Sequence, residues 1–329
     1  MVRKPIFKLE ANGKDITETL RQNLISLGFD DKEGFKSDEI SFKVHGIYAK
    51  PTFGDKLELW LGWAGEGAEG ADNMWLCGKF AVQTCERDFK EQSTEVRATA
   101  VDFASEIKTK KRRSWENTTL FAIAGKIADK NALRLKTSGE DMAIRSRLQD
   151  GVSDLEFLYS LSKELGYLAA TKNDTLILAP KKSGDDETDE AEKGGDGLPQ
   201  IELNLSDLAS LNITEANRNA YNAVVCEWQD IASGKRKQIK VGKGKQTYKM
   251  QIPEPKSDAE AYRLAQSKLN ELKKGGINGR CSCMGANIVA GAQIKFKGAV
   301  GLEDVKFSVK SVSHTLEPSA YNIEIEFEG

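Results

Sequence analysis

The sequence has few of the residues on which membrane proteins and most catalytic sites depend. Its 329 residues include only two histidines and five cysteines, and no apolar run approaches the roughly 18 residues that a membrane span requires. Arg3 and Lys4, close to the N-terminus, are not followed by an apolar segment, so a secretory signal is not expected. These absences predict a protein that is cytoplasmic at synthesis and has no membrane anchor.

The cysteines are odd in number and scattered through the chain. A chain of this length does not need disulfides for stability, so free thiols are expected. Cys281 and Cys283 form the only close pair, and a tetrahedral zinc site would need His45 and His314 as its remaining ligands. Neither a metal, nor a cofactor, nor histidine acid–base chemistry is therefore predicted.

Common catalytic motifs are missing as well. The sequence holds no Gly-x-Ser-x-Gly nucleophile elbow, no His-Glu-x-x-His zinc motif and no Walker loop, and residues 242–245 are more typical of a hairpin turn than of a phosphate-binding loop. Glu324, Glu326 and Glu328 alternate along one expected strand, which is typical of a solvated face rather than of a glycosidase pair. We therefore predict no enzymatic activity, and a cell-wall glycan hydrolase is a disfavoured alternative.

Apolar periodicity divides the chain into strand-rich and helical parts. The first hundred residues alternate in short segments separated by turns, which is typical of a barrel or a sandwich. A period of about 3.6 residues then predicts a helix from near Thr118 to near Asn131. Capping boxes at Ser153 and Ser257 predict two further helices, the second over about residues 257–274.

The local structure of three other segments is predicted separately. Residues 15–27 fit a short helix or a strand pair equally well, and residues 234–250 fit a basic hairpin. Residues 183–198 carry seven carboxylates and four glycines but a single large apolar residue, Leu198, which predicts a flexible acidic linker. The spacing of these carboxylates does not match a calcium-binding loop.

Two basic runs stand out although the charges nearly balance, at 48 basic and 50 acidic residues. Residues 108–113 hold five cations, and residues 235–249 hold seven without a carboxylate. Such runs can bind phosphates, but only Tyr248 accompanies the second run, so a stacking platform for bases is missing. We favour a charged lumen, a subunit contact to an acidic partner or plain solvation over nucleic-acid binding. The residues predicted for this contact are Lys235, Arg236, Lys237, Lys240, Lys243 and Lys245.

Four segments in one order carry a family resemblance. They are Ser114–Asn117, Ser153–Tyr167, Tyr221–Asp230 and Val312–Leu316. With this order of elements, the chain resembles the late control protein D family of contractile-tailed phages over essentially its whole length. The resemblance extends to the tail hubs of Mu-like phages and R-type pyocins, and to the N-terminal half of type VI secretion spike proteins.

The resemblance implies an α+β, β-rich fold in which two β-barrel-like hub domains flank a small α/β domain. The implied domains are a first barrel at 1–107, the α/β domain at 108–182, the acidic linker at 183–198 and a second barrel with one helix at 199–329. It further implies a homotrimer that adapts a sixfold tail tube to a threefold central spike. Such a task requires self-complementary surfaces rather than an active site.

The implied partners are a separate spike protein, the tail tube, other baseplate proteins and, as a further candidate, the tape measure protein. A separate spike is expected because the chain ends at Gly329, directly after its last expected strand, and no lysozyme-like segment is present. The implied location is the tail baseplate of a virion or tail-like particle assembled in the bacterial cytoplasm. A DNA-binding late-gene regulator that uses residues 108–113 and 235–249 is the alternative.

Overall fold

The computed structural model covers most of the chain and describes its secondary structure in eleven stretches. The described residues are 3–34, 37–100, 109–172, 175–180, 200–215, 221–231, 233–243, 246–255, 257–273, 277–302 and 305–329. The predicted acidic linker at 183–198, Lys108 and Lys245 lie outside them. Within these stretches, no helix is long and apolar enough to cross a membrane.

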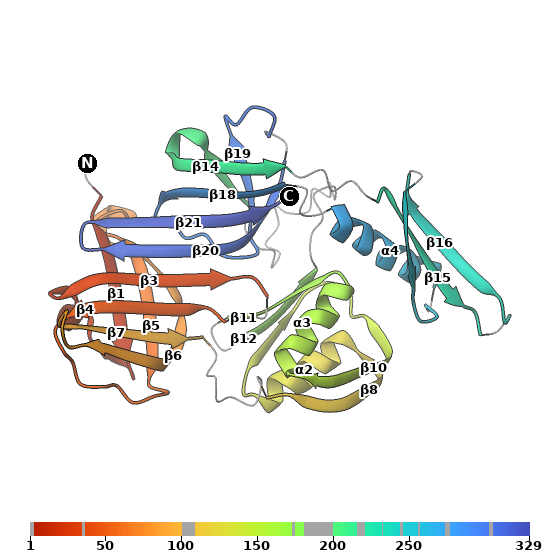
Figure 1. Cartoon of the computed structure of the whole chain (residues 1–329), viewed down its shortest axis with the longest axis horizontal. Coiled ribbons are helices and arrows are strands. Elements are labelled where there is room, and N and C mark those ends of the chain that lie inside the picture. Colours follow the sequence, from red (N-terminus) through yellow and green to blue (C-terminus); the bar gives the residue numbers. More distant parts are fainter. Residues whose placement is uncertain are drawn as a thin grey trace.

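One large sheet joins the two ends of the chain (Figure 1). Its strands, in spatial order, are β14 (Leu208–Glu215), β18 (Ile277–Met284), β21 (Ala320–Glu328), β20 (Phe307–Glu317), β3 (Leu24–Lys32), β4 (Glu39–His45), β7 (Ser93–Thr99), β6 (Asn73–Asp88), β5 (Lys56–Trp63), β1 (Pro5–Ala11) and β2 (Lys14–Asp15). β19 (Gln293–Lys297) pairs with β20 and with β13 (Gln200–Asn204). A short helix, α1 (Thr17–Arg21), precedes β3, so residues 15–27 contain both a helix and the start of a strand.

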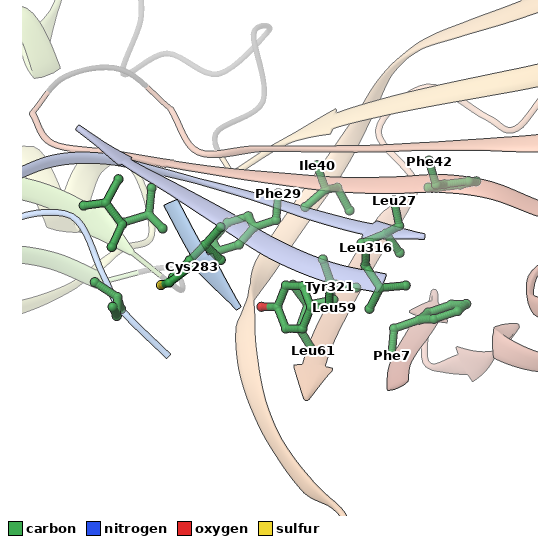
Figure 2. Close-up of a cluster of buried hydrophobic side chains, with 14 of the residues drawn as sticks. Phe7, Leu27, Phe29, Ile40, Phe42, Leu59, Leu61, Cys283, Leu316 and Tyr321 are labelled. Atoms are coloured by element: carbon green, nitrogen blue, oxygen red, sulfur yellow. The ribbon is translucent and has the colours of Figure 1, made fainter. Parts of the chain in front are cut away.

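The N-terminal and C-terminal strands share one core. β20 pairs antiparallel with β3, which places His314 opposite Phe29 in the ladder. Buried side chains from both ends of the chain form a single cluster, and Figure 2 shows Phe7, Leu59 and Leu61 close to Leu316 and Tyr321. The alternation predicted for residues 321–328 is confirmed, because Tyr321, Ile323, Ile325 and Phe327 are all buried.

A small α/β unit follows the first set of strands. Its elements are a two-stranded ribbon of β8 (Lys111–Thr119) and β10 (Ala143–Val152), a sheet of β11 (Tyr167–Lys172), β12 (Thr175–Pro180) and β9 (Arg134–Thr137), and the helices α2 (Leu120–Lys130) and α3 (Asp154–Glu164). The predicted helix starts are confirmed to within two residues. Ser153 accepts a hydrogen bond from the backbone N–H of Glu156, as the capping box requires, and Thr119 caps α2 in the same way.

A third unit holds the second basic run. Its sheet has the order β16 (Arg236–Gly242), β15 (Ala223–Gln229) and β17 (Thr247–Gln251), and α4 (Asp258–Lys273) packs on one face. In Figure 1 this unit projects from the molecule on the side opposite to β1. The predicted helix at 257–274 is confirmed, and Ser257 accepts a hydrogen bond from the backbone N–H of Glu260.

The predicted hairpin at residues 234–250 is wrong. β16 and β17 do not pair with each other, because β15 lies between them, antiparallel to β16 and parallel to β17. β15 is the most apolar of the three strands, so the central position buries it best. β16 ends at Gly242 and β17 begins at Thr247 on the other side of β15, so the hairpin turn predicted at 242–245 is wrong. Gly242 has φ +91°, and a Cβ there would lie 2.4 Å from the carbonyl oxygen of Asn222.

The fold is therefore α+β and β-rich, as predicted. No sheet formed by the described residues closes on itself. The predicted arrangement of two β-barrel-like domains is accordingly not confirmed. The domain boundaries predicted at 107/108 and across 183–198 stay predictions, since residues 101–108 and 181–199 lie outside the described stretches.

Candidate functional site

The structure places the predicted contact residues on and around β16. Arg236, Lys237 and Lys240 lie on this edge strand, with Lys235 just before it and Lys243 just after it, and all five side chains are exposed. Lys245 lies outside the described residues. The sequence therefore predicted the cationic segment correctly. The side chains of β16 nevertheless point to both faces of its sheet.

The two faces of β16 have different roles. Val241 belongs to the cluster against α4, and Ile239 packs against that cluster, so the intervening residues point to the other face. Lys240 on that face lies in register with Val225 of β15, which in turn lies in register with Lys249 of β17. Lys240 and Lys249 are both exposed. A sheet face with cations on both edge strands can bind an acidic protein surface.

Two of the cations are held by carboxylates of their own unit. Lys237 forms an ion pair with Asp230 in the turn before β16, and Arg236 Nη1 lies 3.6 Å from Glu227 Oε2. The hydrogen bond from Lys237, with further hydrogen bonds from Ser233, holds the pKa of Asp230 far below its usual range, and the same contact raises the pKa of Lys237. Lys237 therefore holds the turn before β16, and Arg236 holds the neighbouring strand β15.

The first basic run has a structural role that the sequence analysis missed. Lys111 Nζ and Arg113 Nη2 lie 2.5 and 2.6 Å from the two carboxylate oxygens of Asp154, the first residue of α3. The side chain of Asp154 is fully buried. Arg112 pairs with Asp150 on the surface, at 3.1 Å. These pairs engage three of the five cations of the run, which weighs against the DNA-binding alternative.

Gln149 completes the hydrogen bonds around Asp154. Its amide nitrogen donates to Asp154 Oδ1 and to the carbonyl of Val152, both at 3.0 Å. Its amide oxygen accepts from Arg113 Nε at 2.9 Å and from Trp115 Nε1 at 3.3 Å. The only signal in the sequence was the Ser-Asp-Leu-Glu start of the helix, which predicted an N-terminus but not its partners on β8.

The acidic row on β21 is a solvated face, as predicted. Glu324 and Glu326 are half-exposed and share Arg280 at 3.0 and 2.6 Å, and Glu328 lies 2.9 Å from Lys310. All five cysteines are free, and burial raises the pKa of Cys283 to about 11 and that of Cys281 to about 12, which makes both thiols unreactive. Among the described residues, no group of three or more His, Cys, Asp or Glu side chains could hold a metal ion.

A cavity of about 740 Å³ separates the α/β unit from β17 and α4. Its lining combines Leu161, Ile252 and Leu264 with the arginines of β10. Ion pairs join the two units around it: Arg145 lies 3.9 Å from Glu254, and Arg263 of α4 pairs with Glu140. The described lining contains neither histidine nor cysteine, and its chemistry is that of an interface between two packed units.

The fold is that of several β-rich phage tail proteins of known structure. The chain superposes over 98% of its length on a 43 kDa tail protein of prophage MuSo2 from Shewanella oneidensis, with a TM-score of 0.68 and 11% identity, covering 98% of that chain. A tail protein from Neisseria meningitidis gives a TM-score of 0.70 with 12% identity over 99% of this chain and 97% of that chain. An Escherichia coli type VI secretion component gives a TM-score of 0.57 with 14% identity, covering 97% of this chain and 76% of that chain.

Sequence relatives point to a particular component of the tail. The chain is 26% identical over 279 residues to the probable baseplate hub protein of Escherichia phage 186, covering 82% of this chain and 69% of the relative. It is 27% identical over 230 residues to the probable baseplate hub protein of Escherichia phage P2, which covers 68% of this chain and 56% of that protein. No family model matches the chain. The expected resemblance to phage tail hub proteins is confirmed.

Proposed function

We propose that the chain is a structural hub protein of a phage tail baseplate. The similarity to the phage 186 baseplate hub protein over 279 residues carries this proposal, and the tail-protein fold supports it. The described residues offer paired charges and polar strand faces rather than a catalytic constellation, which suits a non-enzymatic role. The protein would act in the tail baseplate of a virion or tail-like particle.

The finer proposal concerns assembly. We infer a homotrimer whose strand-rich ends form two barrel-like walls per subunit, so that three chains present six similar walls to a tail tube and a threefold face to a separate spike. The continuity of the large sheet supports this, because strands from both ends of the chain share one core and would move as one body. Other baseplate proteins and the tape measure protein are further proposed partners.

Assembly of the purified protein tests this proposal. We expect light scattering to give three times the chain mass of 36.3 kDa, and negative-stain images to show threefold rings that bind the spike and tube proteins of the same particle. Deleting the gene from a strain that produces the particle is expected to leave tails without a complete baseplate. Normal, infective tails after deletion would contradict the hub role, whatever the oligomeric state of the isolated chain.

The outward face of the β16–β15–β17 sheet gives a sharper version of the predicted basic contact. Reversing Lys240 and Lys249 to glutamate is expected to weaken binding to an acidic baseplate partner by roughly tenfold or more, because both positions face outward. The measurement is co-sedimentation with partner proteins at low and physiological salt.

The matched control for this experiment is Lys237→Glu. Lys237 pairs with Asp230, so its reversal should lower stability through the loss of this ion pair. Unchanged binding by the double variant would show that this face of the sheet does not contact the acidic partner. Salt-dependent binding of duplex DNA that is lost in the double variant would instead favour the nucleic-acid alternative.

A further inference from the structure

The third unit has a hydrophobic core of its own. The buried side chains of this core come from β15, β16 and α4, and they are Val224, Cys226, Val241, Ala265 and Leu269. The α/β unit has a separate buried cluster, formed by its own helices and strands. Among the described residues, no buried cluster takes side chains from both units. The third unit is therefore attached to the α/β unit by its surface and not by a shared core.

Two ion pairs cross between these units. Arg263 of α4 pairs with Glu140, in the loop before β10. Arg145 of β10 lies 3.9 Å from Glu254, in the segment between β17 and α4. Glu254 also accepts a hydrogen bond from the backbone N–H of Ile231, at 3.1 Å, which fixes this carboxylate within the third unit. Each unit thus supplies one arginine and one carboxylate to the contact.

Both ion pairs are open to solvent. The side chains of Arg263 and Glu140 are 51% and 77% exposed, and the side chain of Arg145 is 68% exposed. Ion pairs between such exposed groups are weak, and dissolved salt screens them further. The strength of the attachment therefore depends on ionic strength, unlike the buried cores within the two units.

Apolar packing between the two units is interrupted by the cavity of about 740 Å³. Leu161 of α3, Leu264 of α4 and Ile252 all line this cavity, so they lack apolar contacts on the side that faces it. At the end of α3, a Cβ on Gly166 would lie 3.1 Å from Ser267 Oγ of α4, so a hydroxyl and not an apolar side chain packs there. Figure 1 shows α4 between the α/β unit and the strands β15 and β16. Little hydrophobic contact therefore holds α4 against the α/β unit.

We propose that the third unit is a movable arm, and that the two ion pairs form a salt-sensitive clasp that holds it against the α/β unit. Units of one chain move relative to each other unless the interface between them is large and apolar, and this interface is polar and interrupted by a cavity. When rising ionic strength screens the two pairs, the third unit moves away and exposes the apolar lining of the cavity. The clasp lies within one chain, so the proposal does not depend on the number of copies in an assembly.

Charge reversal in the clasp tests the proposal. Arg263→Glu places two carboxylates opposite each other, so its radius of gyration in about 50 mM NaCl should exceed that of the wild type by roughly 5% or more. Small-angle X-ray scattering coupled to size-exclusion chromatography measures this for species of equal mass. The wild type should expand in the same way in about 500 mM NaCl, and the dye anilinonaphthalene sulfonate should then fluoresce more strongly on the exposed apolar lining.

A charge swap is the matched rescue. Combining Arg263→Glu with Glu140→Arg restores a pair of opposite charges, so the compact form should return at low salt. Arg280→Glu is the control for the change of charge, because Arg280 pairs with Glu324 and Glu326 within the large sheet. This control should be as compact as the wild type at low salt and should expand equally at high salt.

Three other outcomes contradict the clasp. A wild type whose radius of gyration does not change with salt would overturn it, and so would an Arg263→Glu variant as compact as the wild type. An expansion that the charge swap does not reverse would show that this ion pair does not hold the third unit. If Arg263→Glu loses helical circular dichroism, Glu140→Arg takes its place because Glu140 lies outside α4, and a compact Glu140→Arg variant then overturns the proposal. The hub role is tested separately by the gene deletion.

Discussion

Replacing Asp154 by alanine is expected to lower the free energy of unfolding of the α/β unit by about 3 kcal/mol. The buried carboxylate accepts hydrogen bonds from Lys111, Arg113 and Gln149, and its removal leaves two cations and one amide without their partner. Breaking a buried ion pair by removing one member costs about 3–5 kcal/mol. The lower end applies because the side chains of Lys111 and Arg113 remain 17% and 31% exposed.

The matched control is Asp150→Ala on the adjacent strand β10. Asp150 is 58% exposed and pairs with Arg112, which is itself 78% exposed, so its removal should change stability by less than about 0.5 kcal/mol. Urea unfolding followed by tryptophan fluorescence compares both variants with the wild type, since Trp115 donates to the same Gln149. Asp154→Asn should fall between the two, because it keeps the shape but loses the charge. Equal midpoints for Asp154→Ala and Asp150→Ala would show that the network contributes nothing.

The Asp154 network illustrates what local sequence patterns can and cannot predict. The capping box at Ser153 and Glu156 predicted the start of α3 correctly, because it depends only on residues three positions apart. The partners of Asp154 come from β8, about forty residues earlier, and their approach depends on how β8 pairs with β10. Lys111 and Arg113 consequently looked like part of a surface run, although both point at a buried carboxylate.

Strand pairing is the second feature of the fold that sequence patterns do not predict. Alternation predicted strands such as β4, β5 and β21, since one face of each is buried, but β1, β13, β14 and β18 were not predicted. Alternation does not identify partners, and the β3–β20 ladder joins residues that are nearly three hundred positions apart. For the same reason, the sequence of residues 234–250 predicts a hairpin. In the structure, the apolar strand β15 lies between β16 and β17.

His314 lies at the joint between the two ends of the chain. It is on β20 opposite Phe29 of β3, and its Nδ1 lies 2.7 Å from the hydroxyl oxygen of Tyr321 on β21. Its side chain is almost completely buried among aromatic rings, including those of Phe29 and Tyr321. Burial lowers the pKa of His314 to about 4, against the attraction of Asp31 and Asp30 on β3. The imidazole is therefore neutral in the folded protein at physiological pH.

Acidification from pH 7.5 to pH 5 is expected to lower the free energy of unfolding by about 2 kcal/mol through this one residue. An unfolded histidine has a pKa of about 6.5, so between that pH and about 4 the unfolded chain binds a proton that the folded chain excludes. Stability is therefore complete above about pH 6.5 and is lost as the pH falls towards 4. Urea unfolding at both pH values measures the loss. His314→Asn should remove most of it, although it lowers stability at pH 7.5, whereas His45→Asn should not, because the only other histidine is exposed. An equally steep pH dependence in His314→Asn would assign the effect to carboxylates instead.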